Sequence, residues 1–207
     1  MRKVLILASG GLDSTVVIAL YKNLGYDVHL LYLPYGNVNE KAETERLLKL
    51  REKFCIPVEN TYRVKLDLNY SNSKCIGKSD GATYVEMRNL IFISYAISVA
   101  EAKGIDEVAI GFIKSLDEYK DTTEEFVVMM NNLSVSTTGI EVKAPLKHLD
   151  KQGVYELGKK LGVSLTDVFS CNTPNGDKPC GECYDCVDTK QLIKQCNIPD
   201  EENLFKN

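Results

Sequence analysis

Short apolar runs alternate with longer mixed stretches along the chain, and this alternation predicts an α/β fold. Residues 4–8 are wholly apolar, which is typical of a strand buried on both faces of a sheet. Similar short runs predict further strands at residues 28–33, 61–68, 108–111 and 140–144. The stretches between them predict helices at residues 15–24, 38–54, 86–103, 124–135 and 151–161. Strands joined by helices form a mostly parallel sheet, so we expect ligands at the carboxyl ends of the strands.

A glycine-rich loop, Ser9 to Ser14, separates the first predicted strand from the first helix. Gly10 and Gly11 allow a close approach to an anion, and the free N–H groups of a helix amino end supply donors. The spacing matches neither a Walker A motif nor Gly-x-Gly-x-x-Gly. Asp13 suits such a loop if it binds a magnesium ion that bridges phosphates. A tight strand–helix turn with Asp13 or Ser14 as its cap remains the alternative.

The seven cysteines are unevenly spread, and most of them fall in one short segment after the last predicted helix. The four in this segment are Cys171, Cys180, Cys183 and Cys186. Two-residue gaps let neighbouring thiolates converge, and four thiolates complete a tetrahedral zinc site. A chance cluster of buried or redox-active cysteines is the alternative. We therefore expect a nucleotide-binding domain at residues 1–165 and a zinc-binding segment, with structural zinc, at residues 166–207.

Composition and charge restrict the class of protein. The chain has 207 residues, is 44% hydrophobic and 26% charged, and carries a formal net charge of −4. These values predict a globular protein and argue against a nucleic-acid partner. The longest apolar stretch is far shorter than a membrane span, and the first apolar run is too short for an export signal. We expect a cytoplasmic protein with reduced thiols.

The loop sequence Ser-Gly-Gly-x-Asp-Ser resembles the phosphate loop of the ATP pyrophosphatase (PP-loop) superfamily. Within it, Tyr84-Val85-x-x-Arg88-Asn89, the segment Tyr119-x-Asp121 and the zinc motif resemble the 7-cyano-7-deazaguanine synthase (QueC-like) family. The similar motifs occur in the same order from about residue 4 to residue 186, nearly the whole chain.

The resemblance implies an adenine-nucleotide alpha hydrolase-like fold, a five-stranded parallel sheet with helices on both faces. It implies catalytic roles for Asp13, Arg88 and Asp121, and ATP with magnesium as the nucleotide. The residues implied to bind ATP are Ala8, Ser9, Gly10, Gly11, Leu12, Asp13, Ser14 and Thr15.

The reaction implied is that of an ATP-dependent carbon–nitrogen ligase. A carboxylate is adenylated, pyrophosphate leaves, and ammonia displaces AMP to give an amide. In the family the substrate is 7-carboxy-7-deazaguanine, and a second ATP dehydrates the amide to the nitrile. The resemblance leaves a homodimer open.

Departures from the family motifs keep other functions open. Glu86 and Met87 replace the family's Pro-Gly, and Tyr119 to Thr123 lack its Pro, Cys and Arg. A related ligase that adenylates another acid, or modifies a protein, is therefore an alternative. A tRNA thiolase is disfavoured because the chain is acidic and Cys55 and Cys75 are unsuitably spaced. An intact loop argues against a non-catalytic nucleotide-binding module.

Overall fold

The computed structural model describes residues 1–78, 83–115, 119–175, 178–199 and 205. One five-stranded sheet forms the centre of the molecule, in the order β3-β2-β1-β4-β5. Every neighbouring pair of strands is parallel, which confirms the predicted fold class. The strands are β1 (Lys3–Leu7), β2 (Asp27–Tyr32), β3 (Thr61–Arg63), β4 (Glu107–Ala109) and β5 (Glu141–Lys143).

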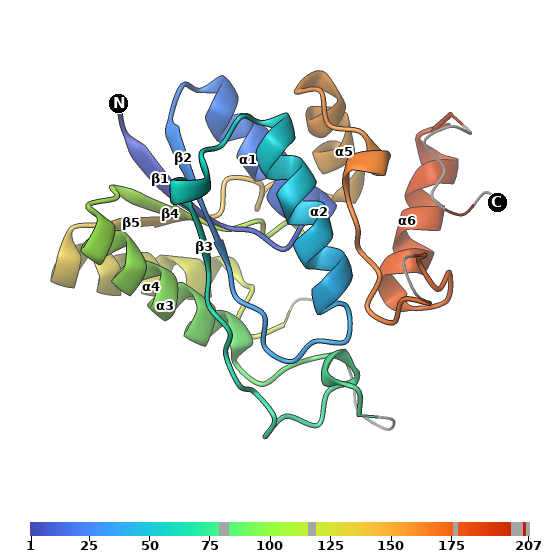
Figure 1. The fold of residues 1–207 in the computed structure, drawn as a ribbon, viewed down its shortest axis with the longest axis horizontal. Helices are drawn as coiled ribbons and strands as arrows, with labels where there is room; N and C mark the ends of the chain where they lie inside the picture. The colour runs from blue at the N-terminus through green and yellow to red at the C-terminus, as the bar shows by residue number, and fades with distance from the viewer. Residues whose placement is uncertain (79–82, 116–118, 176–177, 200–204, 206–207) are drawn as a thin grey trace.

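Helices cover both faces of the sheet (Figure 1). They are α1 (Leu12–Asn23), α2 (Glu40–Lys53), α3 (Arg88–Lys103), α4 (Glu124–Thr138), α5 (Lys151–Lys160) and α6 (Tyr184–Gln195). Short 3₁₀ turns occur at Val58–Asn60, Lys74–Ile76 and Leu165–Asp167. Helices α3 and α4 share one apolar cluster with the sheet, whereas α1, α2, α5 and α6 share the cluster on the other face. None of the described helices combines the length and apolar composition that crossing a bilayer requires.

Two elements differ from the sequence prediction. Strand β3 ends at Arg63 rather than at residue 68. Beyond it, the Val64 N–H still donates to the carbonyl of Tyr32 in β2, and the Leu66 N–H donates to the carbonyl of Pro34 just after β2. Leu66 pairs there with Pro34, which has no N–H to return, so the ladder stops. The zinc segment was expected to follow the last helix, but it contains α6, which starts directly after Cys183. Helix α6 buries Leu192 in the cluster of α1 and α5.

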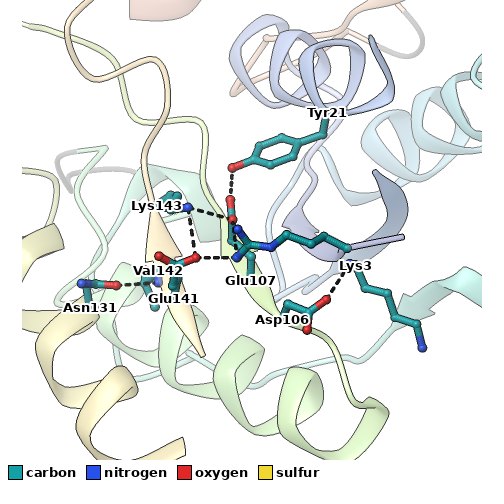
Figure 2. Close-up of polar contacts among 9 residues, drawn as sticks. Lys3, Tyr21, Asp106, Glu107, Asn131, Glu141, Val142 and Lys143 are labelled. Atoms are coloured by element: carbon teal, nitrogen blue, oxygen red, sulfur yellow. Dashed lines mark hydrogen bonds and ion pairs between the residues drawn. The ribbon is translucent and has the colours of Figure 1, made fainter. Parts of the chain in front are cut away.

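A cluster of ion pairs around the buried residue Glu107 lies at the amino-terminal ends of β4 and β5. The Glu107 side chain is fully buried, and its carboxylate accepts from the Tyr21 hydroxyl and from Lys143 Nζ, the latter at 2.9 Å (Figure 2). Arg2 Nη2 lies 3.6 Å from the same carboxylate and 2.5 Å from Glu141 Oε2. Burial and the Glu107 carboxylate raise the pKa of Tyr21 above its ordinary value. A buried charge is stable only when it is paired, and the neighbours of Glu107 supply that pairing. We therefore assign the cluster a structural role at the end of the sheet opposite the cleft.

Gly111 lets the start of α1 pack directly against the chain that leaves β4. A Cβ at Gly111 would lie 2.9 Å from the Ser14 nitrogen and 3.0 Å from the Asp13 carbonyl carbon. Real Cβ atoms are not found so close to backbone atoms, and neither backbone segment has room to move away. The absent side chain therefore fixes the distance between the glycine loop and β4.

Gly111→Ala is expected to destabilise the protein by about 1–3 kcal/mol, because the added methyl group must push α1 away from β4. Thermal and urea unfolding measure this effect. Gly11→Ala is the matched control, since its Cβ would meet its nearest neighbours at an ordinary 3.5 and 3.6 Å. Equal stability of the two variants would show that the contact at Gly111 does not constrain the loop.

Candidate active site

A cleft of about 400 Å³ opens at the carboxyl ends of β1, β2 and β4. The strand order reverses between β1 and β4, because β2 lies on one side of β1 and β4 on the other. This is the position where open α/β sheets bind ligands. The cleft is lined by the glycine loop, by the amino ends of α3 and α5, and by the segment that follows Val168.

The glycine loop presents the amino end of α1 to the cleft. Gly10 adopts a positive φ of 79°, which a residue without a side chain tolerates. The Gly11 carbonyl accepts from the Thr15 hydroxyl at 2.7 Å and from the Ser14 hydroxyl at 3.2 Å. The first N–H groups of the helix have no partner inside the helix and remain available to an anion.

Most of the residues expected to bind ATP line the cleft. Those that do are Ala8, Ser9, Gly11, Leu12, Asp13 and Ser14. Gly10 and Thr15 are not among the lining residues: the Gly10 carbonyl accepts from the Phe169 N–H at 2.9 Å, and Thr15 is fully buried. These two residues support the loop from behind, and the assignment of ATP to the loop stays a prediction.

Asp13 contacts a lysine to which the sequence analysis assigned no role. Lys151, the first residue of α5, places Nζ 3.1 and 3.2 Å from the two carboxylate oxygens of Asp13. Burial acts to lower the pKa of Lys151, but the Asp13 carboxylate outweighs it, so the pKa lies above its ordinary value. Asp185 of α6 lies near this pair, and burial raises the pKa of its carboxyl. The lysine is therefore held charged at the edge of the loop.

Arg88 lies at the other end of the cleft, where α3 begins. Its Nη1 donates to the Tyr35 hydroxyl at 2.9 Å, and the guanidinium carbon lies 5.3 Å from the centre of the Tyr35 ring and 5.7 Å from that of Phe92. The Nε atom is buried and has no hydrogen-bond partner among the described residues. Burial acts to lower the pKa of Arg88, yet Tyr35 and other neighbours keep it above its ordinary value. A buried donor without a partner in a cleft is a position for an anionic ligand.

Asp121 caps the helix that carries Arg88. Its Oδ2 accepts from the Asn89 N–H at 2.9 Å, and the residue is almost completely buried. Tyr119 and Thr122 line the cleft, whereas Asp121 is not among the lining residues. The contact places Asp121 behind the cleft wall as a support for α3, and its predicted direct part in catalysis stays a prediction.

Glu43 is a second lining residue for which the sequence analysis assigned no role. Its carboxylate accepts from the Tyr32 hydroxyl and Asn37 Nδ2, both at 2.9 Å, and from Asn39 Nδ2 at 3.2 Å. Burial raises the pKa of Glu43 to about 7, although these hydrogen bonds act to lower it. Asn39 Nδ2 also donates to the carbonyl of Cys171 at 3.0 Å, so the network joins β2 and α2 to the cysteine segment.

The four clustered cysteines meet as the spacing predicts. All four Sγ atoms lie within 4.8 Å of one another, and two of the Sγ–Sγ distances are 3.9 Å. Zinc–sulfur bonds of about 2.3 Å in a tetrahedron separate the sulfurs by a little under 4 Å, so this set fits a closed zinc site. Backbone N–H groups of Glu182 and Cys183 donate to the Cys180 sulfur at 3.4 and 3.3 Å, as they would to a thiolate.

The cysteine segment forms one wall of the cleft. Phe169, Ser170, Asn172 and Asp185 all line it, and Phe169 bonds to the glycine loop. Lys151 and Glu43 had only weak signals in the sequence, namely a lysine at the first position of a helix and a glutamate one turn into another. Their importance depends on contacts with residues far away in the chain.

Two solved structures share the fold. The U34-tRNA thiolase NcsA from Methanococcus maripaludis superposes with a TM-score of 0.56 at 15% identity, covering 95% of this chain and 68% of that chain. NMN synthetase from Francisella tularensis gives a TM-score of 0.53 at 19% identity, covering 97% of this chain and 80% of that chain. At such identities the likeness concerns the fold alone.

Sequence similarity is more specific. A Rickettsia bellii protein named 7-cyano-7-deazaguanine synthase is 30% identical over 224 residues, which cover 99% of this chain and 99% of that protein. The family model described as "Queuosine biosynthesis protein QueC" matches residues 3–196. The match extends from the first strand through the glycine loop and the cleft to the cysteine cluster, and confirms the resemblance seen in the motifs. The chain therefore belongs to the family of queuosine biosynthesis protein QueC.

Proposed function

We propose that this protein is an ATP-dependent carbon–nitrogen ligase that converts 7-carboxy-7-deazaguanine to 7-cyano-7-deazaguanine through the amide. One observation carries the proposal: a single cleft is lined both by the amino end of α1, suited to phosphate, and by Arg88, whose guanidinium group is suited to a carboxylate. The name of the Rickettsia bellii relative, 7-cyano-7-deazaguanine synthase, supports the choice of product.

The phosphate end of the cleft consists of the glycine loop, Asp13 and Lys151. The N–H groups of the loop would bind the triphosphate, and Asp13 is the residue that would hold a magnesium ion. When bound, magnesium neutralises phosphate charge. Lys151 now contacts Asp13, and its ammonium group would move to a phosphate oxygen once Asp13 is engaged elsewhere. In the nucleotide complex, Asp13 would thus contact magnesium and Lys151 would contact phosphate.

The acid end of the cleft consists of Arg88 and the aromatic rings beside it. Arg88 would hold the substrate carboxylate so that one of its oxygens forms a bond to the α-phosphorus while the bond to pyrophosphate breaks. Ammonia then forms a bond to the acyl carbon, and AMP leaves. No protein nucleophile takes part, so catalysis rests on positioning and on neutralising charge.

The residues around Tyr119 favour a different acid as an alternative substrate. Tyr119 lines the cleft, and the residues after it lack the Pro, Cys and Arg of the family motif. The Tyr119 hydroxyl forms a hydrogen bond with the Thr83 hydroxyl at 3.0 Å. The same adenylation on another acid is the alternative function. Sulfur transfer is not supported, because all seven cysteines belong to the described residues and none of them lines the cleft.

Zinc bound by Cys171, Cys180, Cys183 and Cys186 would serve structure rather than chemistry. Four protein ligands leave no open coordination position for a substrate. Its proposed role is to hold the wall that carries Phe169 and Asp185 against the glycine loop.

Incubation with ATP, magnesium, ammonium and 7-carboxy-7-deazaguanine, followed by mass spectrometry, tests the proposed reaction. Amide and nitrile are the expected products, together with AMP and pyrophosphate. Formation of amide alone would limit the protein to the first half of the reaction. AMP release with a different acid, and none with this one, would favour the alternative acceptor.

Asp13→Asn is expected to lower acid-dependent AMP release by about 100-fold or more, because the variant loses the carboxylate that would hold the charge-neutralising magnesium ion. Coupled assays of AMP, with thermal melting as a check on folding, measure the effect. Glu45→Gln is the control, since Glu45 is an exposed carboxylate on α2 outside the cleft. Unchanged turnover of the Asp13 variant would refute the assignment of the loop to phosphate.

Cys183→Ser is expected to lose bound zinc and to lower the melting temperature by more than about 5 °C, because metal binding contributes to folding energy. Metal analysis and calorimetry give the two values. Cys55→Ser is the matched control, because Cys55 is exposed and lies outside the cluster. A purified Cys183 variant with full zinc content would contradict the metal assignment.

A further inference from the structure

The carboxyl group of Glu43 lines the cleft but has no part in the phosphate or carboxylate binding proposed above. Among the described residues, the acidic side chains that line the cleft are Asp13, Glu43 and Asp185. Asp13 contacts Lys151, and Asp185 lies within electrostatic range of the same lysine. Glu43 is therefore the carboxylate of the cleft that is not committed to this lysine.

Glu43 lies between the two ends of the cleft. Its backbone carbonyl oxygen is 3.4 Å from the position that a Cβ on Gly10 would occupy, so it packs against the glycine loop. In the other direction, the charge of Arg88 acts on its carboxyl group. With phosphates on the loop and the acid on Arg88, the bond between them forms beside Glu43.

The hydrogen bonds of Glu43 leave one acceptor position for a ligand. Oε2 accepts from Tyr32 and Asn37, whereas Oε1 accepts from Asn39 alone among the described residues. An ionised carboxylate has about four acceptor positions, two on each oxygen. Oε1 can therefore accept one more N–H, and a ligand in the cleft can supply it because Glu43 is one of the lining residues.

The surroundings of Glu43 suit proton transfer near neutral pH. The titratable or charged groups that face it are Tyr32 and Tyr35, from the end of β2, and Arg88 of α3. Burial raises the pKa of Glu43 to about 7, against the opposing effect of Tyr32, the two asparagines and Arg88. A carboxyl group with such a pKa can accept a proton and release it again in each turnover.

We propose that Glu43 binds an ammonium ion through Oε1 and takes one proton from it, an inference that rests on the proposed ligase function. Ammonium has no lone pair and cannot attack a carbonyl group. After the proton moves to Oε1, the lone pair of ammonia forms the bond to the acyl carbon. The bond from that carbon to the AMP oxygen breaks, and its electron pair leaves with AMP. The new amide nitrogen loses its extra proton to water, and Glu43 then returns its own proton to water.

A purely structural role for Glu43 makes a different prediction. The network also holds the Cys171 carbonyl through Asn39, so loss of Glu43 could loosen the cysteine wall. Such a defect would lower the rates of adenylation and of attack by any nitrogen source to a similar extent. A role in deprotonating ammonium affects only steps in which ammonium is the nitrogen source.

The experiment compares Glu43→Gln with the wild-type protein at about pH 8, with two nitrogen sources, since hydroxylamine is neutral there and needs no base. Amide formation from ammonium is expected to fall by about 100-fold or more. Hydroxamate formation from hydroxylamine is expected to stay within about threefold of wild type, as is acid-dependent exchange of labelled pyrophosphate into ATP without a nitrogen source. Glu45→Gln on the exposed face of α2 is the matched control and is expected to behave as wild type in all three assays.

Three results would overturn the proposal: full ammonium-dependent activity in Glu43→Gln, equal loss with both nitrogen sources, or loss of the exchange reaction. A raised KM for the acid in the exchange reaction would assign Glu43 to acceptor recognition instead. If the Gln variant does not fold, Glu43→Asp allows the same comparison, because it keeps the charge and withdraws it by one methylene group. Wild-type protein that shows no acid-dependent exchange would instead contradict the proposed ligase function, and with it the role of Glu43.

Discussion

The proposed phosphate site requires the amino end of α1 to reach the cleft with its backbone N–H groups uncovered, and contacts on both sides of the glycine loop are consistent with this constraint. On one side, Gly111 has no side chain, so the backbone after β4 comes into contact with Asp13 and Ser14. On the other side, Gly10 turns with a positive φ, and its carbonyl is held by Phe169. The loop is thus held by contacts on both sides, and a loop held in its binding conformation lowers the entropic cost of binding.

Charged groups are paired differently at the two ends of the sheet. At the amino ends of β4 and β5, Glu107 is buried and fully paired with Tyr21, Lys143 and Arg2, as a stable structural ion cluster requires (Figure 2). At the carboxyl ends, polar groups are left incompletely paired: the donor Arg88 Nε has no partner among the described residues, and the acceptor Glu43 Oε1 accepts a single hydrogen bond there. This incomplete pairing distinguishes the polar groups of Arg88 and Glu43, two residues that line the cleft, from the structural cluster around Glu107.

The fold and the cysteine cluster were largely predictable from local patterns, because strand runs, helix periodicity and Cys spacing are properties of short segments. Helix α6 was missed because the cysteines and turn formers around Cys180 suggested an irregular segment. Its buried residue Leu192 joins the apolar cluster of α1 and α5, which lie far away in the sequence. No role was predicted for Lys151 and Glu43 for a related reason: each is an ordinary charged helix residue until the fold places it beside Asp13 or Tyr32. For Asp121, the cap that it provides to α3 depends on a contact across 32 positions of sequence.

The central claim is that the amino end of α1 binds a triphosphate whose innermost phosphorus is attacked by an acid. A crystal structure with magnesium and a non-hydrolysable ATP analogue tests it most directly. The account predicts phosphate oxygens on the N–H groups of the glycine loop, with the bond between Asp13 and Lys151 broken and Lys151 on a phosphate. A triphosphate bound elsewhere, with the loop vacant and the Asp13–Lys151 pair intact, would contradict it.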